Sequence, residues 1–331
     1  MTNNNDSIIN EYTLHIQEAK NIGIRLDKFL ADSLPFSRTL IQKWLIEGYV
    51  SVNDNVQITK YKTKIGDIIN IQAPSSPQEL SFRAQEMELD ILFEDRHLCI
   101  LNKPAGLVTH PGPGNWQGTL LNGLLYNFPG SQEIPRAGII HRLDKMTSGL
   151  MVVAKTLQAQ NQLVEAMQRR DIKRQYLAIV QGNTWLKGTI DEPIGRHPIY
   201  KTRMAVSKKG KPAKTHYKKI ANLPISNNQS KTLIECTLES GRTHQIRVHM
   251  AHIGHNLLGD GVYSNDKTST FAPTQRQALH AVRLSFIHPI TNEYLNFFTE
   301  PDDELMVEAL NEFELTMATN LYSPYMDNHE E

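Results

Sequence analysis

The sequence predicts an α+β protein in which a small unit is followed by a much larger one. Three observations support this prediction: segments of alternating apolar and polar residues typical of strands, short amphipathic segments typical of helices, and a segment rich in proline and serine at 74–79. The 331 residues suit two domains, at roughly 100–200 residues per domain. We expect a partly disordered N-terminal extension at 1–21, a first domain at 22–74, a linker at 75–81, a second domain at 82–318 and an acidic tail at 319–331.

The first domain is predicted to hold two short helices and a small sheet. Residues 25–34 have the apolar spacing of an amphipathic helix, which Pro35 ends. Ser37 stands where a second helix needs an N-cap, and Gly48 ends that helix. Strands are expected at 11–17, 49–53 and 67–71.

Composition and charge limit the classes of protein that are possible. No apolar run approaches the roughly 18 residues of a membrane helix, and the first residues lack the pattern of a signal peptide. We therefore expect a cytoplasmic protein that has no membrane partner. The two cysteines, Cys99 and Cys236, lie in apolar strand-like segments, where packed thiols are expected instead of a disulfide or a metal pair.

The net charge of zero conceals a strong separation of charge along the chain. Residues 196–219 hold nine basic residues and no acidic one, whereas residues 301–331 hold nine acidic residues and no Lys or Arg. Local clusters set the field that a phosphate backbone experiences, so the basic run suits a nucleic acid, although it could also be a solvated, mobile face. The basic residues are Arg196, Lys201, Arg203, Lys208, Lys209, Lys211, Lys214, Lys218 and Lys219.

The segment His141–Leu150 places one carboxylate, Asp144, between Arg142 and Lys145, directly before an apolar strand. An aspartate in a loop is usually a helix cap or a turn residue. Here the neighbouring cations would keep it ionised and able to act on an electrophile. Asp144 is therefore the first candidate for a catalytic group.

Two further segments of the second domain carry candidate residues. A helix is expected from Thr156 to about residue 170, followed by a strand at 172–180 on which Arg174 and Tyr176 share a face, although such a tyrosine could simply fill the core. After Gly241, residues 244–253 can form a helix that presents Arg247 near the strand ends.

Neither a cofactor nor a metal is expected. The Gly-Pro loop at 102–114 lacks the glycine spacing of a nucleotide-binding loop. Four histidines, His244, His249, His252 and His255, raise the question of a metal hydrolase. The carboxylate of the usual helical zinc motif is missing, so we expect no metal.

The first domain resembles the alpha-L RNA-binding module first described in a ribosomal small-subunit protein. The resemblance covers about 50 residues and includes R-L-D-K-F-L and S-R-T-L-I-Q-K-W-L-I-E-G-Y-V-S-V-N. It implies binding of structured RNA through phosphates and shape, with Arg25, Lys28, Arg38 and Lys43 as contacts. A small scaffold or protein-docking domain is the alternative.

The second domain resembles the RluA-type pseudouridine synthases. The matching segments, in the expected order, are L-N-K-P-A-G-L-V-T-H-P-G, H-R-L-D-K-M-T-S-G-L-M-V-V-A-K-T, R-R-D-I-K-R-Q-Y-L-A and G-R-T-H-Q-I-R-V-H-M-A-H. Met146 departs from the acidic residue often found at its position. The resemblance implies a large, mostly antiparallel mixed sheet flanked by helices, with a cleft across it, and isomerisation of uridine to pseudouridine in RNA without cofactor or metal.

The resemblance also implies roles for particular residues. Asp144 would be the catalytic carboxylate, Tyr176 the base-stacking residue that takes a proton, and Arg247 the cation beside Asp144. Arg142 would occupy the space left by the displaced nucleotide, and Arg174, Arg242 and the basic run would contact RNA. The chemistry requires an ionised carboxylate next to the target and a weak base for the proton on carbon 5.

The expected partner is large-subunit ribosomal RNA or a pre-ribosomal particle, with several uridines of one stem-loop modified by a monomeric enzyme. Two alternatives are a synthase that acts on tRNA and a noncatalytic ribosome-assembly factor that only binds RNA. The second alternative does not require Asp144, Tyr176 and Arg247 together.

Overall fold

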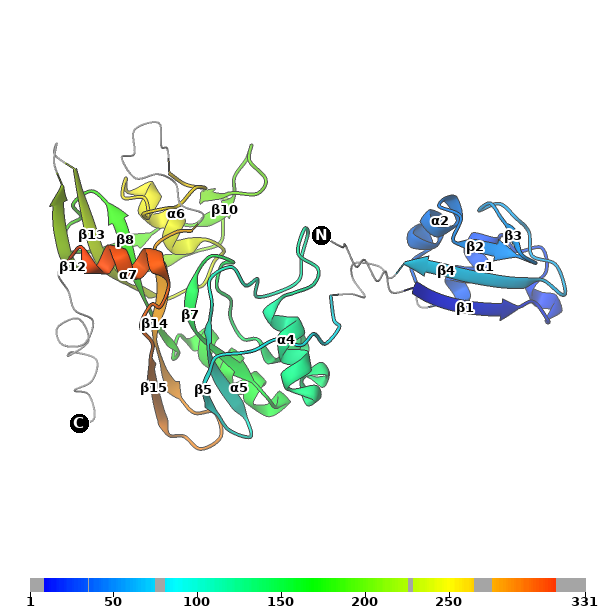
Figure 1. The fold of residues 1–331 in the computed structure, drawn as a ribbon, viewed down its shortest axis with the longest axis horizontal. Coiled ribbons are helices and arrows are strands. Elements are labelled where there is room, and N and C mark those ends of the chain that lie inside the picture. The colour runs from blue at the N-terminus through cyan, green and yellow to red at the C-terminus, as the bar shows by residue number, and fades with distance from the viewer. Residues whose placement is uncertain (1–8, 35, 75–80, 226–228, 265–275, 314–331) are drawn as a thin grey trace. The chain divides into compact units, whose positions relative to one another are not determined.

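The computed structural model describes residues 9–34, 36–74, 81–225, 229–264 and 276–313. The chain divides into two compact units, residues 1–80 and 81–331, and each is described by itself (Figure 1). The predicted acidic tail and the predicted linker, except its last residue, lie outside the described residues. Within the described part of the chain, no helix has the length and apolar character needed to cross a bilayer.

The first unit is a four-stranded antiparallel sheet with two helices, where the sequence predicts two short helices and a small sheet. The sheet order is β1-β4-β2-β3. Residues 9–21, set apart above as an extension, contribute β1 to this sheet, where β1 pairs with β4 over its whole length. The elements are β1 (Ile9–His15), a 3₁₀ turn (Ala19–Asn21), α1 (Leu26–Ser33), α2 (Arg38–Ile46), β2 (Val50–Val52), β3 (Asn55–Val56) and β4 (Ile68–Pro74).

The helices of the first unit bury one face against its sheet. Ser37 caps α2 by accepting a hydrogen bond from the Leu40 N–H, as expected from its position. Trp44 is 2% exposed at the centre of a core built from both helices and the strands. Full burial of such aliphatic and aromatic side chains stabilises the unit by about 1.5–3 kcal/mol each.

The second unit is built on one large mixed sheet. The sheet order is β5-β6-β7-β14-β8-β13-β12-β9, and β15 also pairs with β14. The pair β7–β14 is parallel, and the other pairs of this sheet within the described residues are antiparallel. The predicted α+β fold with a mostly antiparallel sheet is therefore confirmed.

The second unit combines the large sheet with a small sheet and several helices. The strands of the large sheet are β5 (Ile91–Glu94), β6 (Leu98–Lys103), β7 (Ser148–Ala154), β8 (Lys173–Gln181), β9 (Lys187–Asp191), β12 (Lys214–Ile225), β13 (Gln229–Leu238), β14 (Leu279–Ile287) and β15 (Tyr294–Phe298). A separate two-stranded sheet contains β10 (Ile194–Arg196) and β11 (Met204–Val206). The α-helices are α4 (Leu120–Asn127), α5 (Leu157–Arg169), α6 (Gln245–His252) and α7 (Glu304–Asn311), with 3₁₀ turns at Pro129–Glu133 and Pro135–Gly138.

Helices cover both faces of the large sheet because alternate residues of its strands point in opposite directions. On one face, α5 packs on β6, β7 and β14, and α7 packs on β8, β13 and β14. On the other face, α4 and α6 pack against Cys99, Met151, Ala178 and their neighbours. This second face also carries the candidate site.

Both cysteines are free and buried, as predicted. The helix predicted from Thr156 is α5, with Thr156 as its N-cap. The helix α7 was not predicted, since its segment was taken only as part of an acidic run. Its N-cap Asp303 accepts a hydrogen bond from the Met306 N–H, and Met306 and Leu310 are fully buried.

Candidate active site

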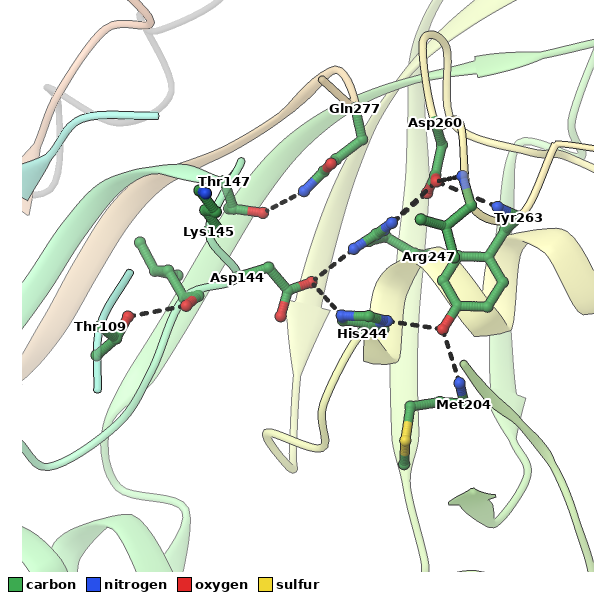
Figure 2. Close-up of polar contacts among 12 residues, drawn as sticks. Thr109, Asp144, Lys145, Thr147, Met204, His244, Arg247, Asp260, Tyr263 and Gln277 are labelled. Atoms are coloured by element: carbon green, nitrogen blue, oxygen red, sulfur yellow. Dashed lines mark hydrogen bonds and ion pairs between the residues drawn. The ribbon is translucent and has the colours of Figure 1, made fainter. Parts of the chain in front are cut away.

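The loop that carries Asp144 leads directly into the central strand β7. Three hydrogen bonds hold its backbone and side chains: the Thr109 hydroxyl donates to the Leu143 carbonyl at 2.8 Å, the Gln277 amide donates to the Thr147 hydroxyl at 2.9 Å, and the Val152 N–H donates to His141 Nε2 at 3.3 Å. Figure 2 shows the first two of these contacts on the two sides of Asp144. The carboxylate therefore stands on a fixed backbone.

A buried lysine also holds the loop that carries Asp144. Lys103 is fully buried, and its Nζ donates to the carbonyls of Pro104 at 2.8 Å, Leu107 at 2.9 Å and Lys145 at 3.3 Å. Burial lowers the pKa of Lys103 to about 7, although the nearby charge of Asp144 acts in the opposite direction. The Gly106 N–H adds a second bond to the Lys145 carbonyl at 2.8 Å. The Gly-Pro loop thus fixes the residue that follows Asp144.

The strand β7 approaches β14 so closely that only glycine fits at the point of contact. Gly149 has a φ of +113°, and a Cβ atom there would lie 2.3 Å from the carbonyl oxygen of Ala281. Ala281 also pairs with Tyr176 on β8. Gly149 therefore permits the strand spacing that places the Asp144 loop and Tyr176 in one neighbourhood.

Arg247, on the first turns of α6, connects two carboxylates. It binds Asp260 through two short hydrogen bonds, Nε to Oδ2 at 2.7 Å and Nη2 to Oδ1 at 2.9 Å. Its remaining Nη1 donates to Asp144 Oδ2 at 3.3 Å (Figure 2). Arg247 is 6% exposed, Asp260 1% and Asp144 14%. The bidentate pair with Asp260 aims the guanidinium, and Asp144 receives a weaker contact from it.

Asp260 is itself held in place by the backbone. Its Oδ1 accepts hydrogen bonds from the N–H groups of Val262 at 2.9 Å and Tyr263 at 3.2 Å. Burial alone would raise the pKa of Asp260, but the Arg247 contact and these backbone donors hold it below its usual value. Although burial disfavours its charge, the pKa of Arg247 is raised by Asp260 and Asp144. The charges at Arg247 and Asp260 are thus permanent at neutral pH.

Tyr176 and Asp144 line the same pocket. The tyrosine is 4% exposed, and burial raises the pKa of its phenol, so it is neutral at pH 7. Arg174 occupies the same face of β8 and is 6% exposed. A Cβ at Gly241 would lie 2.8 Å from Nη1 of Arg174, so this glycine leaves room for the guanidinium. The pocket is lined by Arg142, Leu143, Asp144, Thr147, Arg174, Tyr176, Leu238, Gly241, Arg242, His244, Gln245, Ile246, Arg247 and Leu279.

The structure brings together six of the residues singled out in the sequence. Asp144, Tyr176 and Arg247 line the pocket with Arg142, Arg174 and Arg242, although they come from segments far apart in the chain. Arg142 and Arg242 are exposed at its edge. Among the described residues that line the pocket, four arginines thus accompany a single carboxylate.

The other RNA contacts predicted within the second unit do not line this pocket. Arg196, Lys201, Arg203, Lys208, Lys209 and Lys211 belong to a basic hairpin, defined here as residues 194–211, which contains β10, β11 and their loops. All of these are exposed except Arg203, which is half-buried with its guanidinium 5.1 Å from the Tyr200 ring centre. In the first unit, Arg25, Lys28, Arg38 and Lys43 are all exposed.

The histidines considered as metal ligands have other contacts. His249 is buried, and its two ring nitrogens lie 2.9 Å from the Thr215 hydroxyl and 2.9 Å from the Glu192 carbonyl. His255 contacts the Gln181 carbonyl at 2.9 Å. Among the described residues, no three His, Cys, Asp or Glu side chains are grouped so that they could hold a metal ion.

Sequence reasoning missed four residues that shape the site: Lys103, His244 as a neighbour of Asp144, Asp260 and Tyr263. Asp260 lies between two glycines, a pattern typical of an ordinary turn. Its pairing with Arg247 depends on a tertiary contact that local sequence does not encode. Lys103 could have been noticed because it ends the largely apolar segment that forms β6, and all six residues of this strand are buried.

Comparison with known proteins assigns the family. The sequence pattern of the RNA pseudouridylate synthase family matches residues 97–252. A relative named ribosomal large subunit pseudouridine synthase D, from Nitrosomonas europaea, is 48% identical over 302 residues, covering 89% of this chain and 86% of the relative. The protein of the same name from Escherichia coli K12 is 46% identical and covers 87% and 90%.

Solved structures show the same relationship. The human RNA pseudouridylate synthase domain containing 4 protein superposes with a TM-score of 0.53 at 25% identity, covering 69% of this chain and 94% of that one. The chain therefore belongs to the RNA pseudouridylate synthase family. It is an isomerase that forms pseudouridine in RNA, as its resemblance to the RluA type predicts.

Proposed function

We propose that this enzyme isomerises several uridines of one stem-loop in large-subunit ribosomal RNA, with Asp144 as the catalytic carboxylate. The observation that carries the proposal is the combination of Asp144, Tyr176 and Arg247 in one pocket. The names of relatives that share 46–48% identity over most of the chain support the choice of RNA. We further propose a cytoplasmic, monomeric enzyme that acts on the RNA alone or within a pre-ribosomal particle, without cofactor or metal.

Asp144 begins the reaction at the ribose. Arg247 reaches only Oδ2, and no hydrogen bond to Oδ1 occurs among the described residues. Oδ1 is therefore the atom that attacks the anomeric carbon, or removes a sugar proton to give a glycal, as the bond to nitrogen 1 of uracil breaks. The positive charge of Arg247 stabilises the ionised carboxylate in a site from which bound RNA excludes water.

Tyr176 lies where the freed base must turn before carbon 5 joins the sugar. Its ring stacks on the uracil, and its phenol or a water bound to it accepts the proton from carbon 5. Because burial raises the pKa of Tyr176, the phenol is neutral when the base turns. As its oxygen takes the proton from carbon 5, the phenol gives its own proton to water, and nitrogen 1 of the base takes up a proton from water in exchange.

Basic residues hold the RNA while the base is extruded. Extrusion costs a few kcal/mol, and stacking on one aromatic side chain returns about 1–3 kcal/mol. Arg142, exposed at the pocket edge, fills the space left in the RNA. Arg174 and Arg242, the basic hairpin and the cations of the first unit bind phosphates.

The test is to map pseudouridines in ribosomal RNA and tRNA from a strain of the source organism that lacks the gene. We expect a few neighbouring sites in large-subunit RNA to revert to uridine, and wild type but not Asp144→Asn to restore them. Loss of tRNA sites alone would favour the tRNA alternative. Restoration by Asp144→Asn would favour a noncatalytic binding factor.

A further inference from the structure

A chain of polar contacts runs from the basic hairpin to the catalytic carboxylate. The backbone N–H of Met204, on β11, donates to the Tyr263 hydroxyl at 2.9 Å. That hydroxyl lies 2.7 Å from His244 Nδ1, and His244 Nε2 lies 4.0 Å from Asp144 Oδ2. Figure 2 shows the His244 ring between the tyrosine and the carboxylate. The mechanism described above uses none of these three groups.

The order of donors in this chain favours one tautomer of the histidine. A backbone N–H can only donate, so the Tyr263 oxygen accepts from Met204 and keeps its own proton for another partner. Among the described residues, His244 Nδ1, at 2.7 Å, is the acceptor within reach of that proton. In a neutral imidazole the other nitrogen then carries the proton, and Nε2–H faces Asp144.

The protonation state agrees with this assignment. Burial lowers the pKa of His244, although the charge of Asp144 acts in the opposite direction. The ring is therefore mainly neutral at pH 7. It therefore presents a hydrogen-bond donor toward Asp144 instead of a second full charge beside Arg247.

The backbone conformation of His244 and the contact of its ring with Tyr263 also fix the position of the imidazole. The residue adopts a left-handed conformation with φ 58° and ψ 24° just before α6, which is uncommon for a non-glycine residue. Its ring meets the edge of Tyr263 at 5.6 Å, and the Arg247 guanidinium lies 5.0 Å from the same tyrosine ring. Tyr263 is thus the common support of both groups that approach Asp144 Oδ2.

We propose that His244 is a positioning residue for Asp144, and that Tyr263 couples it to the basic hairpin. This inference rests on the proposed function. RNA that binds the exposed cations of the hairpin would shift Met204, and with it Tyr263 and His244. A shift of roughly 1 Å would bring His244 Nε2 from 4.0 Å to hydrogen-bonding distance of Asp144 Oδ2. Oδ2 would then accept from both Arg247 and His244, and Oδ1 would be turned to the ribose. The carboxylate would be fully aligned only when RNA occupies the hairpin.

Amide substitutions distinguish this role from simple packing. The amide of glutamine can reach the place of Nε2, whereas that of asparagine reaches only the place of Nδ1. His244→Gln therefore keeps a donor to Asp144, and His244→Asn keeps only the partner of Tyr263. Tyr263→Phe preserves the ring but removes the hydroxyl between the histidine and the hairpin. His252→Gln, on the exposed end of α6, is the matched control.

The experiment measures single-turnover tritium release from large-subunit ribosomal RNA transcribed with uridine tritiated at carbon 5, together with RNA affinity by filter binding. Since a hydrogen bond to a charged group contributes about 1.5–3 kcal/mol, we expect His244→Asn to lower the rate at saturating RNA about 10–100-fold. His244→Gln should retain most of the rate, Tyr263→Phe should fall between them, and His252→Gln should match wild type. RNA affinity and melting temperature should change little in any of them.

Two results would overturn the inference while leaving the proposed function intact. One is a His244→Asn variant that reacts as fast as wild type. The other is an equal loss in His244→Gln and His244→Asn, which would indicate packing alone. A wild type that releases no tritium would instead overturn the proposed function, and this inference with it.

Discussion

Each unit contains an aspartate surrounded by arginines, and the two sites differ in how completely the carboxylate is satisfied. In the first unit, Asp27 is fully buried and accepts five hydrogen bonds of 2.7–3.0 Å from Arg25, Arg38 and Gln42. In the second unit, Asp144 is 14% exposed and accepts one bond of 3.3 Å from Arg247. Asp27 has the contacts of a structural group. In Asp144, by contrast, Oδ1 accepts no hydrogen bond from the described residues and can act on a substrate.

Neighbouring cations alone therefore do not identify a catalytic aspartate. Arg25 and Arg38 converge on Asp27, while the strongest contacts of Arg247 are made to Asp260 and only its third nitrogen reaches Asp144. Asp260 thus restrains the arginine, so that Asp144 is stabilised without being saturated. At Asp27, burial would raise the pKa, but the donors hold it well below its usual range.

Apart from changes to Asp144 itself, the largest effect is expected from removing the restraint on Arg247. In Asp260→Asn the buried guanidinium loses its charged partner, which costs about 3–5 kcal/mol of stability. Arg247 can then turn fully to Asp144, whose carboxylate becomes saturated with hydrogen bonds as that of Asp27 is. Misplacement of the catalytic groups on this scale lowers the rate about 10²-fold. Chemical unfolding and single-turnover tritium release measure the two effects.

Asp191→Asn is the control for this change, since Asp191 is 60% exposed and pairs with Lys214 at the surface. That variant should keep both stability and rate. If Asp260→Asn also kept its rate, Asp260 would not be what sets the geometry of Arg247 and Asp144.

The reciprocal change in the first unit should affect stability and RNA binding but not chemistry. Asp27→Asn weakens the hydrogen bonds of two arginines and costs about 1–3 kcal/mol. Because Arg25 and Arg38 are then less ordered, RNA affinity should fall several-fold, while the single-turnover rate at saturating RNA stays unchanged. A loss of rate at saturation would show that Asp27 acts on the chemistry after all.

Acid should unfold the second unit before the first. His141 and His280 are buried, and burial lowers the pKa of each to about 3. Below pH 6.5 the unfolded chain binds protons that the folded unit does not, so stability falls by about 1.4 kcal/mol per pH unit for each histidine until pH 3. Asp27 stabilises the first unit above pH 3.8, and this stabilisation is lost only below that pH, because the pKa of Asp27 in the folded unit is lowered.

Tryptophan fluorescence can follow the two units separately during acid titration. Trp44 reports on the first unit, and Trp116 and Trp185 report on the second. With the other tryptophans changed to phenylalanine, the second unit should lose its signal at higher pH than the first. The reverse order would contradict the assignment of these histidines as neutral, buried groups.

Much of the fold and part of the site followed from local sequence. The cap at Ser37, the helix from Thr156 and the strand with Arg174 and Tyr176 on one face depend on neighbouring residues, so local patterns were sufficient. The gathering of Asp144, Tyr176 and Arg247 was expected only through the resemblance to a family. Their catalytic roles stay predictions.

What sequence could not predict depends on contacts between distant segments. The pair Arg247–Asp260 spans a turn, Lys103 and Lys145 meet across two loops, and His244 meets Tyr263 only because the chain returns after α6. The helix α7 was overlooked because its segment was read only as part of an acidic run, although Met306 and Leu310 are fully buried.

The most direct measurement is release of tritium from carbon 5 of uridine in large-subunit ribosomal RNA by the purified protein and its Asp144→Asn variant. We expect one tritium released per pseudouridine formed by wild type. The variant should bind RNA with the same affinity and melt at the same temperature, but its rate should be at least about 10⁴-fold lower. Release by Asp144→Asn at a rate near that of wild type would contradict the central claim that this carboxylate performs the reaction.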